Sequence, residues 1–123
     1  MTEQQHLKQA RHNLRLFDQL DVAQFPDWAA TLLFYCAVHH LEACLIRIGY
    51  RRPATGSHSE RLQAMVNCGR IPAATQHLYR RLKQDSTYAR YEDWRKHGIT
   101  DAYVRQRRQS DVPGLVRALG SIK

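Results

Sequence analysis

A long, almost wholly apolar run from about Asp27 to Ile48 constrains the fold of this chain more than any other feature. Its apolar residues would occupy nearly every face of a helix, so such a helix must be covered on several sides, by neighbouring helices or by a second subunit. The most apolar part, Trp28 to Val38, is followed by the polar residues His39, His40 and Glu42. A membrane span needs about 20 predominantly apolar residues, so we expect a buried core helix and no membrane insertion.

Local signals along the rest of the chain predict further helices joined by short loops. Apolar residues recur every three or four positions between Leu7 and Phe17, which gives a single apolar stripe. Ser57 and Glu60 have the spacing of a capping box, and Gly49 and Pro72 stand where helices commonly end and begin. The expected helices run from about Thr2 to Leu20, Asp27 to Ile48, Ser57 to Gly69, Pro72 towards Ala89 or Trp94, and Asp111 to Ile122, with residues 99–109 open between helix and extended loop.

These signals predict an all-α fold, a bundle of four or five helices in a single domain spanning residues 1–123. A chain of this length buries a core without metal or disulfide links. The three cysteines are an odd number, and Cys36 and Cys44 lie inside the apolar run, which argues against a secreted disulfide framework. The polar N-terminus lacks the apolar stretch of a signal peptide. We therefore expect a cytoplasmic protein.

The formal charge of +8 is concentrated in the last two thirds of the chain. Residues 1–46 carry three basic and five acidic groups, whereas residues 47–108 carry fourteen basic and five acidic groups. A basic surface attracts polyanions, so RNA, DNA or nucleotides are expected partners. The same balance also fits a domain in which the charge serves only solubility.

The expected fourth helix combines basic and aromatic residues in a pattern that suits a nucleic acid. Ser86 and Arg90 lie one turn apart and share one face of this helix. Arginine beside tyrosine suits phosphate and base contacts, although the pattern equally fits a solvated helix whose tyrosines pack inward. The candidate nucleic-acid-binding residues of this segment are Arg80, Arg81, Lys83, Ser86, Tyr88 and Tyr91.

A metal site is the alternative that the long apolar helix itself suggests. Cys36, His40 and Cys44 follow one another at four-residue spacing and share one helix face. A single helix rarely supplies a full tetrahedral ligand set, and no second Cys/His pair has ligand spacing elsewhere. We therefore favour a partly buried histidine pair at a packing or subunit interface, and we expect no metal or other cofactor.

Three short patterns follow one another along the chain: Tyr35-x3-His39-His40-x-Glu42-x2-Leu45, then His58-Ser59-Glu60-Arg61, and then Ser86-x3-Arg90-Tyr91. With the order of the helices, they resemble the HEPN superfamily, small helical domains named for higher eukaryotes, prokaryotes and nucleotide binding. The resemblance covers roughly residues 5–97 and suggests a divergent bacterial or phage-type member. It implies a four- or five-helix up-and-down bundle that forms a homodimer through its long helices, and it adds His58 and Arg61 to the candidate nucleic-acid-binding residues.

Many HEPN domains are metal-independent ribonucleases of toxin–antitoxin, CRISPR and abortive-infection systems, and these carry an Arg-x(4–6)-His motif. Arg90 and His97 match the long limit of this motif, although Tyr91 stands where active members commonly have a small polar residue, and Arg52 and His58 match the spacing as well. The resemblance implies that His97 acts as general acid or base while Arg90 stabilises the charge on the phosphate. On a continuous helix the two would lie two turns apart, so sharing one phosphate requires a helix break or a second subunit.

Two functions follow as expectations from the resemblance. The first is a homodimer that binds RNA or a nucleotide, with metal-independent ribonuclease activity in a toxin–antitoxin or defence system. The second is a non-catalytic interaction domain whose partner is a nucleotidyltransferase-type protein, since other HEPN domains are inactive and encoded beside one. In either case we expect the long apolar helix, around Phe34 and Val38, to supply much of the dimer interface.

Overall fold

Helices make up all the regular secondary structure of the described residues, 1–50 and 56–123. In this computed structural model they are, in chain order, α1 (Glu3–Gln19), α2 (Pro26–Arg47), α3 (His58–Asn67), α4 (Ala73–Tyr91), α5 (Asp101–Gln106), the π-helical turn η1 (Arg107–Asp111) and α6 (Val112–Gly120). The last three follow one another without a break, so the described residues contain five helices when these three are counted as one. The expected all-α fold is confirmed.

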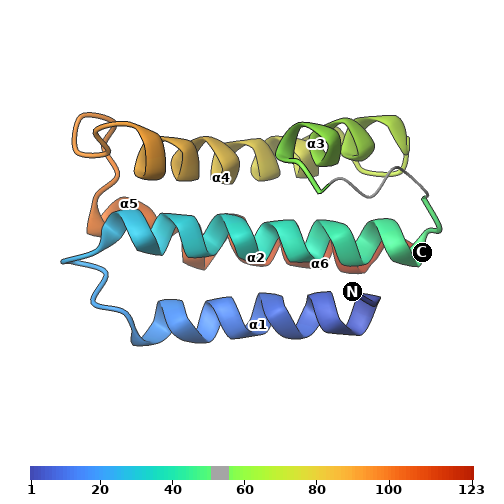
Figure 1. Cartoon of the computed structure of the whole chain (residues 1–123), viewed down its shortest axis with the longest axis horizontal. Helices are drawn as coiled ribbons and strands as arrows, with labels where there is room; N and C mark the ends of the chain where they lie inside the picture. Colours follow the sequence, from blue (N-terminus) through green and yellow to red (C-terminus); the bar gives the residue numbers. More distant parts are fainter. Residues whose placement is uncertain (51–55) are drawn as a thin grey trace.

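The apolar helix α2 lies at the centre of the bundle and packs against α1, α3, α4, α5 and α6. Figure 1 shows α1 and α4 on opposite sides of α2, with α6 running behind it. The long helices alternate in direction along the chain. This arrangement brings the start of α2 next to the end of α4, where Arg90 and Tyr91 lie.

Most predicted helix boundaries are confirmed, because local signals set them. Thr2 and Gln5 form a reciprocal capping box at α1, with hydrogen bonds of 3.1 and 2.8 Å. Ser57 caps α3 by accepting a hydrogen bond from the Glu60 N–H at 3.2 Å. Gly49 follows α2 with φ +71°, the left-handed conformation that glycine adopts without steric cost.

α4 ends at Tyr91, between the two ends, Ala89 and Trp94, that the sequence allowed. Glu92 is extended, with φ −136° and ψ 177°, and the following residues fold into a turn in which the Ile99 N–H donates to the Trp94 carbonyl at 3.2 Å. The side chain of Ile99 is buried in the core. Burial of this side chain favours the turn over a continued helix.

Residues 99–109, which the sequence left open, are mostly helical. Thr100 caps α5, and Arg107 lies in the π-helical turn that follows. Arg107 and Asp111 are buried and paired with each other at 3.4 Å, and Arg107 also pairs with Asp85 of α4 at 3.0 Å. Because charged residues face inward here, the apolar periodicity that would reveal a helix is missing.

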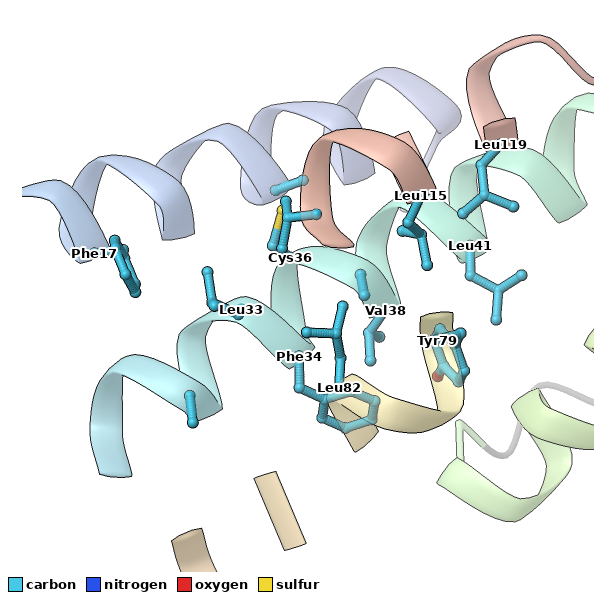
Figure 2. Close-up of a cluster of buried hydrophobic side chains, with 14 of the residues drawn as sticks. Phe17, Leu33, Phe34, Cys36, Val38, Leu41, Tyr79, Leu82, Leu115 and Leu119 are labelled. Atoms are coloured by element: carbon cyan, nitrogen blue, oxygen red, sulfur yellow. The ribbon is translucent and has the colours of Figure 1, made fainter. Parts of the chain in front are cut away.

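The hydrophobic core surrounds α2 and draws side chains from α1, α4 and α6 (Figure 2). Its labelled members in Figure 2 are Phe17, Leu33, Phe34, Cys36, Val38, Leu41, Tyr79, Leu82, Leu115 and Leu119. Phe34 and Val38 are only 0% and 4% exposed within one chain. The chain's own helices therefore cover the residues that we expected at a dimer interface. α2 is long and apolar enough to cross a membrane, but 67% of its most apolar window is buried in the bundle, as in a core helix of a soluble protein.

Candidate nucleic-acid interface

Arg90, in the last turn of α4, lies between two tyrosines. Its Nη1 donates a hydrogen bond to the Tyr35 hydroxyl of α2 at 3.1 Å. Its guanidinium carbon lies 5.5 Å from the centre of the Tyr35 ring and 4.9 Å from that of the Tyr91 ring. Arg90 forms no ion pair with any carboxylate in the described part of the chain. Its positive charge is therefore available to an anionic ligand.

A depression of about 390 Å³ adjoins Arg90 between the start of α2 and the end of α4. It is lined by Asp27, Trp28, Thr31, Ala89, Arg90 and Tyr91. Trp28 is 59% exposed and Tyr91 is 74% exposed, which is unusual for such large aromatic side chains in a folded domain. Two exposed aromatic rings beside a free guanidinium are suited to stacking on bases and binding phosphate.

His97, the other member of the predicted catalytic pair, lies in the turn after α4. Its ring stacks on Tyr88, with 3.7 Å between ring centres and 4° between planes. Its Nε2 is 3.5 Å from a Glu92 carboxylate oxygen, an ion pair when the histidine is protonated. Arg90 and His97 thus interact with different residues, and no contact joins them within the described chain. The break in α4 that would bring them together is present at Glu92, but it leads His97 back onto Tyr88.

A second depression, of about 450 Å³, lies along the outer face of α4. It is lined by Leu62, Arg80, Lys83, Gln84, Thr87, Tyr88 and Glu92. Three of the predicted nucleic-acid-binding residues, Arg80, Lys83 and Tyr88, are therefore brought together on one surface. Arg81 is drawn away from it towards Asp111, at 3.6 Å.

Two predicted binding residues, Ser86 and Arg61, have buried side chains. Ser86 is fully buried in the bundle, and only its carbonyl reaches the site, where it accepts a long hydrogen bond from Arg90 Nε at 3.4 Å. Arg61 is also buried and pairs with Glu42 of α2 at 2.7 Å. The Ser86 side chain is therefore inaccessible to a ligand, whereas Arg61, 7% exposed, lines a depression of about 670 Å³. Arg52, which matches the Arg–His spacing with His58, lies outside the described residues.

His58, the first residue of α3, connects Arg61 to Tyr35. Its Nδ1 lies 2.8 Å from Arg61 Nη1, and its Nε2 lies 3.4 Å from the Tyr35 hydroxyl. Burial lowers the pKa of His58, and the positive charges of Arg61, Arg90 and Lys83 lower it further. Tyr35 and Trp28 are site residues that sequence reasoning missed, because aromatic side chains within an apolar helix are expected to pack in the core.

The histidines and cysteines of α2 do not form a metal site. Cys36 and Cys44 are fully buried, and burial raises the pKa of the Cys36 thiol to about 12. Burial also lowers the pKa of His40 to about 4, helped by the charges of Arg11, His39 and Arg47. Among the described residues, no three histidine, cysteine, aspartate or glutamate side chains are grouped to hold a metal ion. The alternative based on Cys36, His40 and Cys44 has no support from this geometry.

Comparisons with protein families, with curated proteins and with solved structures found no match to this chain. Its likeness to HEPN domains therefore depends on the three sequence patterns given above. The geometry of Arg90 and its neighbours is independent of that likeness.

Proposed function

We propose that this protein is a HEPN-like domain that binds RNA or a nucleotide at the depression between α2 and α4. The observation that carries the proposal is Arg90, which has no carboxylate partner among the described residues and lies beside the exposed rings of Trp28 and Tyr91. The guanidinium binds phosphate, and the rings stack on bases. Asp27, in the same depression, offers a carboxylate that accepts hydrogen bonds from ribose hydroxyl or base amino groups.

The basic depression on α4 extends this surface. Arg80 and Lys83 line it, so a strand that leaves the aromatic depression meets further positive charge. Each phosphate contact releases counterions. The logarithm of the binding constant for a single strand therefore falls with the logarithm of salt concentration, with a slope of about −0.7 per contact. A steep salt dependence is therefore expected for RNA and a shallow one for a mononucleotide.

The experiment compares RNA binding by the native protein and by Arg90→Ala, using the fluorescence anisotropy of a short labelled single strand. Arg117→Ala is the matched control, because Arg117 is an exposed arginine on α6. Arg90→Ala should weaken RNA affinity about tenfold, because the variant loses the guanidinium that binds phosphate and stacks on bases. Arg117→Ala should change RNA affinity less than about threefold. An equal effect of the two variants would show that only net charge matters.

The proposal includes metal-independent ribonuclease activity, in a toxin–antitoxin or defence system, and this activity would require a homodimer. Since Arg90 and His97 interact with different residues within one chain, a reacting phosphate would need groups from two copies. We expect cleavage of single-stranded RNA in EDTA to be abolished by Arg90→Ala or His97→Ala. Cleavage retained in both variants would exclude this pair.

A protein partner is the second candidate, and the exposed Trp28 and Tyr91 favour it. Large exposed aromatic residues are common anchors at protein interfaces. If the domain serves as a partner of a nucleotidyltransferase-type protein, Trp28→Ala should abolish co-purification with that protein. RNA binding by the purified domain would then be absent, which separates this candidate from the first.

A further inference from the structure

We propose that Tyr35, His58 and Arg90 form a phosphate-binding centre in which the Tyr35 hydroxyl donates a hydrogen bond to a phosphate oxygen. This inference rests on the proposed function and names the chemical group that the site recognises. It also assigns the histidine beside Arg90 to α3 rather than to the turn after α4. The ligand is the phosphate of a nucleotide or of an RNA strand.

Three helices converge on the Tyr35 hydroxyl. α2 contributes Tyr35 itself, α4 contributes Arg90 Nη1 at 3.1 Å, and α3 contributes His58 Nε2 at 3.4 Å. All three side chains are half-buried, so each is both held by the fold and open to solvent. Such a convergence of polar groups from separate elements is the arrangement expected of a ligand site.

The hydrogen bonds around His58 determine which groups donate. Arginine has only donors, so the His58 Nδ1 at 2.8 Å from Arg61 must accept and carries no proton. The proton of the neutral ring is then on Nε2, which faces the Tyr35 hydroxyl. The oxygen of Tyr35 therefore accepts from both His58 and Arg90. Its own proton has no acceptor among the described residues and is free for an anionic ligand.

The centre also carries an excess of positive charge, which favours an anionic ligand. Glu42 neutralises Arg61 at 2.7 Å, behind His58. Arg90 and Lys83 have no carboxylate partner in the described part of the chain, and both are close enough to His58 to lower its pKa. A phosphate group bound at Tyr35 would place negative charge where these two positive charges are uncompensated.

The centre packs against the buried Phe34 and lies between two depressions along α2. Phe34, which is fully buried, holds the His58 ring with 5.1 Å between ring centres. Tyr35 follows Thr31 by one turn, and Thr31 lines the aromatic depression of about 390 Å³. Tyr35 precedes His39 by one turn, and His39 lines a depression of about 670 Å³. A phosphate at Tyr35 would thus place an attached nucleoside beside Trp28 and Tyr91.

The test is isothermal titration of the native protein, Tyr35→Phe and Tyr50→Phe with AMP, with adenosine and with a short single-stranded RNA. Tyr35→Phe removes only the hydroxyl, and Tyr50→Phe removes a tyrosine hydroxyl from the larger depression as a matched control. We expect Tyr35→Phe to weaken AMP or RNA about tenfold or more, because a hydrogen bond to a charged group is lost. Adenosine binding should stay unchanged, and the variant should remain folded, with a lower unfolding midpoint because Arg90 and His58 lose an acceptor.

The outcomes separate the two proposals. If the native protein binds neither AMP nor RNA, the proposed function fails and this inference fails with it. If it binds them and Tyr35→Phe binds equally well, only the phosphate centre is wrong. An effect on AMP alone indicates a terminal phosphate, and an effect on RNA alone indicates a phosphodiester.

A second measurement follows the His58 ring by NMR. Saturation with the bound phosphate compound should raise the pKa of His58, because the new negative charge offsets Arg61, Arg90 and Lys83. The same titration in Tyr35→Phe should give a smaller rise. A His58 pKa that does not change when the ligand binds would overturn the inference.

Discussion

Histidines in this fold have different environments, and burial lowers the pKa of His39, His40 and His58. His97 stacks on Tyr88 beside a glutamate, whereas His58 faces the donors of Arg61 and so must stay neutral to accept its hydrogen bond. His40 is half-buried, and burial with the nearby charges of Arg11, His39 and Arg47 lowers its pKa to about 4. A histidine whose pKa is lowered by folding destabilises the native state when it becomes protonated.

We predict that acidification destabilises this protein and that His40 carries part of the effect. The unfolded chain takes up a proton at His40 near pH 6.5, but the folded chain does so only near 4, so stability is full above 6.5 and falls below it. At pH 5 the loss from His40 is about 2 kcal/mol at most. Urea unfolding of native protein and His40→Gln at pH 7 and pH 5 measures it.

The control for this prediction is His12→Gln, because His12 is exposed on α1. That variant should lose as much stability on acidification as the native protein, whereas His40→Gln should lose less. Parallel losses in all three proteins would show that other groups, such as His39 or His58, account for the pH dependence.

At the scale of single residues, the sequence predicts which side chains share a helix face but does not predict which of them are buried. The spacing of Ser86 and Arg90 correctly puts them on one side of α4, but it cannot say where the bundle covers that side. Ser86 is fully buried, and Arg90, one turn later, reaches the Tyr35 hydroxyl at the edge. Tyr35 and His58 were present in the sequence patterns, yet their contact joins residues 23 positions apart and depends on packing.

Among the elements, the π-helical turn shows how a buried ionic network sets the position of a helix. Asp85 of α4 accepts a hydrogen bond from Tyr103 at 2.6 Å and pairs with Arg107 at 3.0 Å. Asp111, at the end of the turn, pairs with Arg107 and with Arg81 of α4. Burial raises the pKa of Asp85, while its hydrogen bonds to Tyr103 and Arg107 lower it. The network therefore links α4 to the C-terminal helix and favours one position of that helix along α4.

We predict that Asp85→Ala destabilises the protein by about 3 kcal/mol or more, because it leaves the buried Arg107 without its main partner. Asp101→Ala is the matched control, since it breaks an exposed aspartate–arginine pair with Arg105 on α5. That change should cost less than about 1 kcal/mol. Urea unfolding compares the two variants, and similar losses would mean that the Asp85 network contributes no more than a surface ion pair.

Helix ends and helix packing differ in how well the sequence predicts them. Caps and glycines act within a few residues, so α1, α2 and α3 begin and end close to their predicted positions. The end of α4 is set by the burial of Ile99 and by the stacking of His97 on Tyr88, which are tertiary contacts. Residues 99–109 were left open for the same reason, since their charged side chains find partners on α4.

For the whole molecule, the exposed apolar residues lie away from the middle of α2. The apolar sequence of α2 predicts that other elements pack against it on several sides. Within one chain α1, α4 and α6 do so, and Phe34 and Val38 are therefore buried. Trp28, Tyr91 and Phe25 remain exposed, at the start of α2 and the end of α4. If the protein forms the homodimer that its resemblance implies, this end of the bundle offers a group of exposed aromatic side chains for the interface.

We predict that Trp28→Glu yields folded monomers, because it puts a charge into the proposed dimer surface while sparing the core. Phe34→Glu should prevent folding, because it places a charge in a fully buried site. Val66→Glu, at an exposed position on α3, is the control and should remain dimeric. Light scattering after size exclusion gives the mass, and circular dichroism gives the helix content. A monomeric native protein would contradict the homodimer, and a dimeric Trp28→Glu variant would place its interface elsewhere.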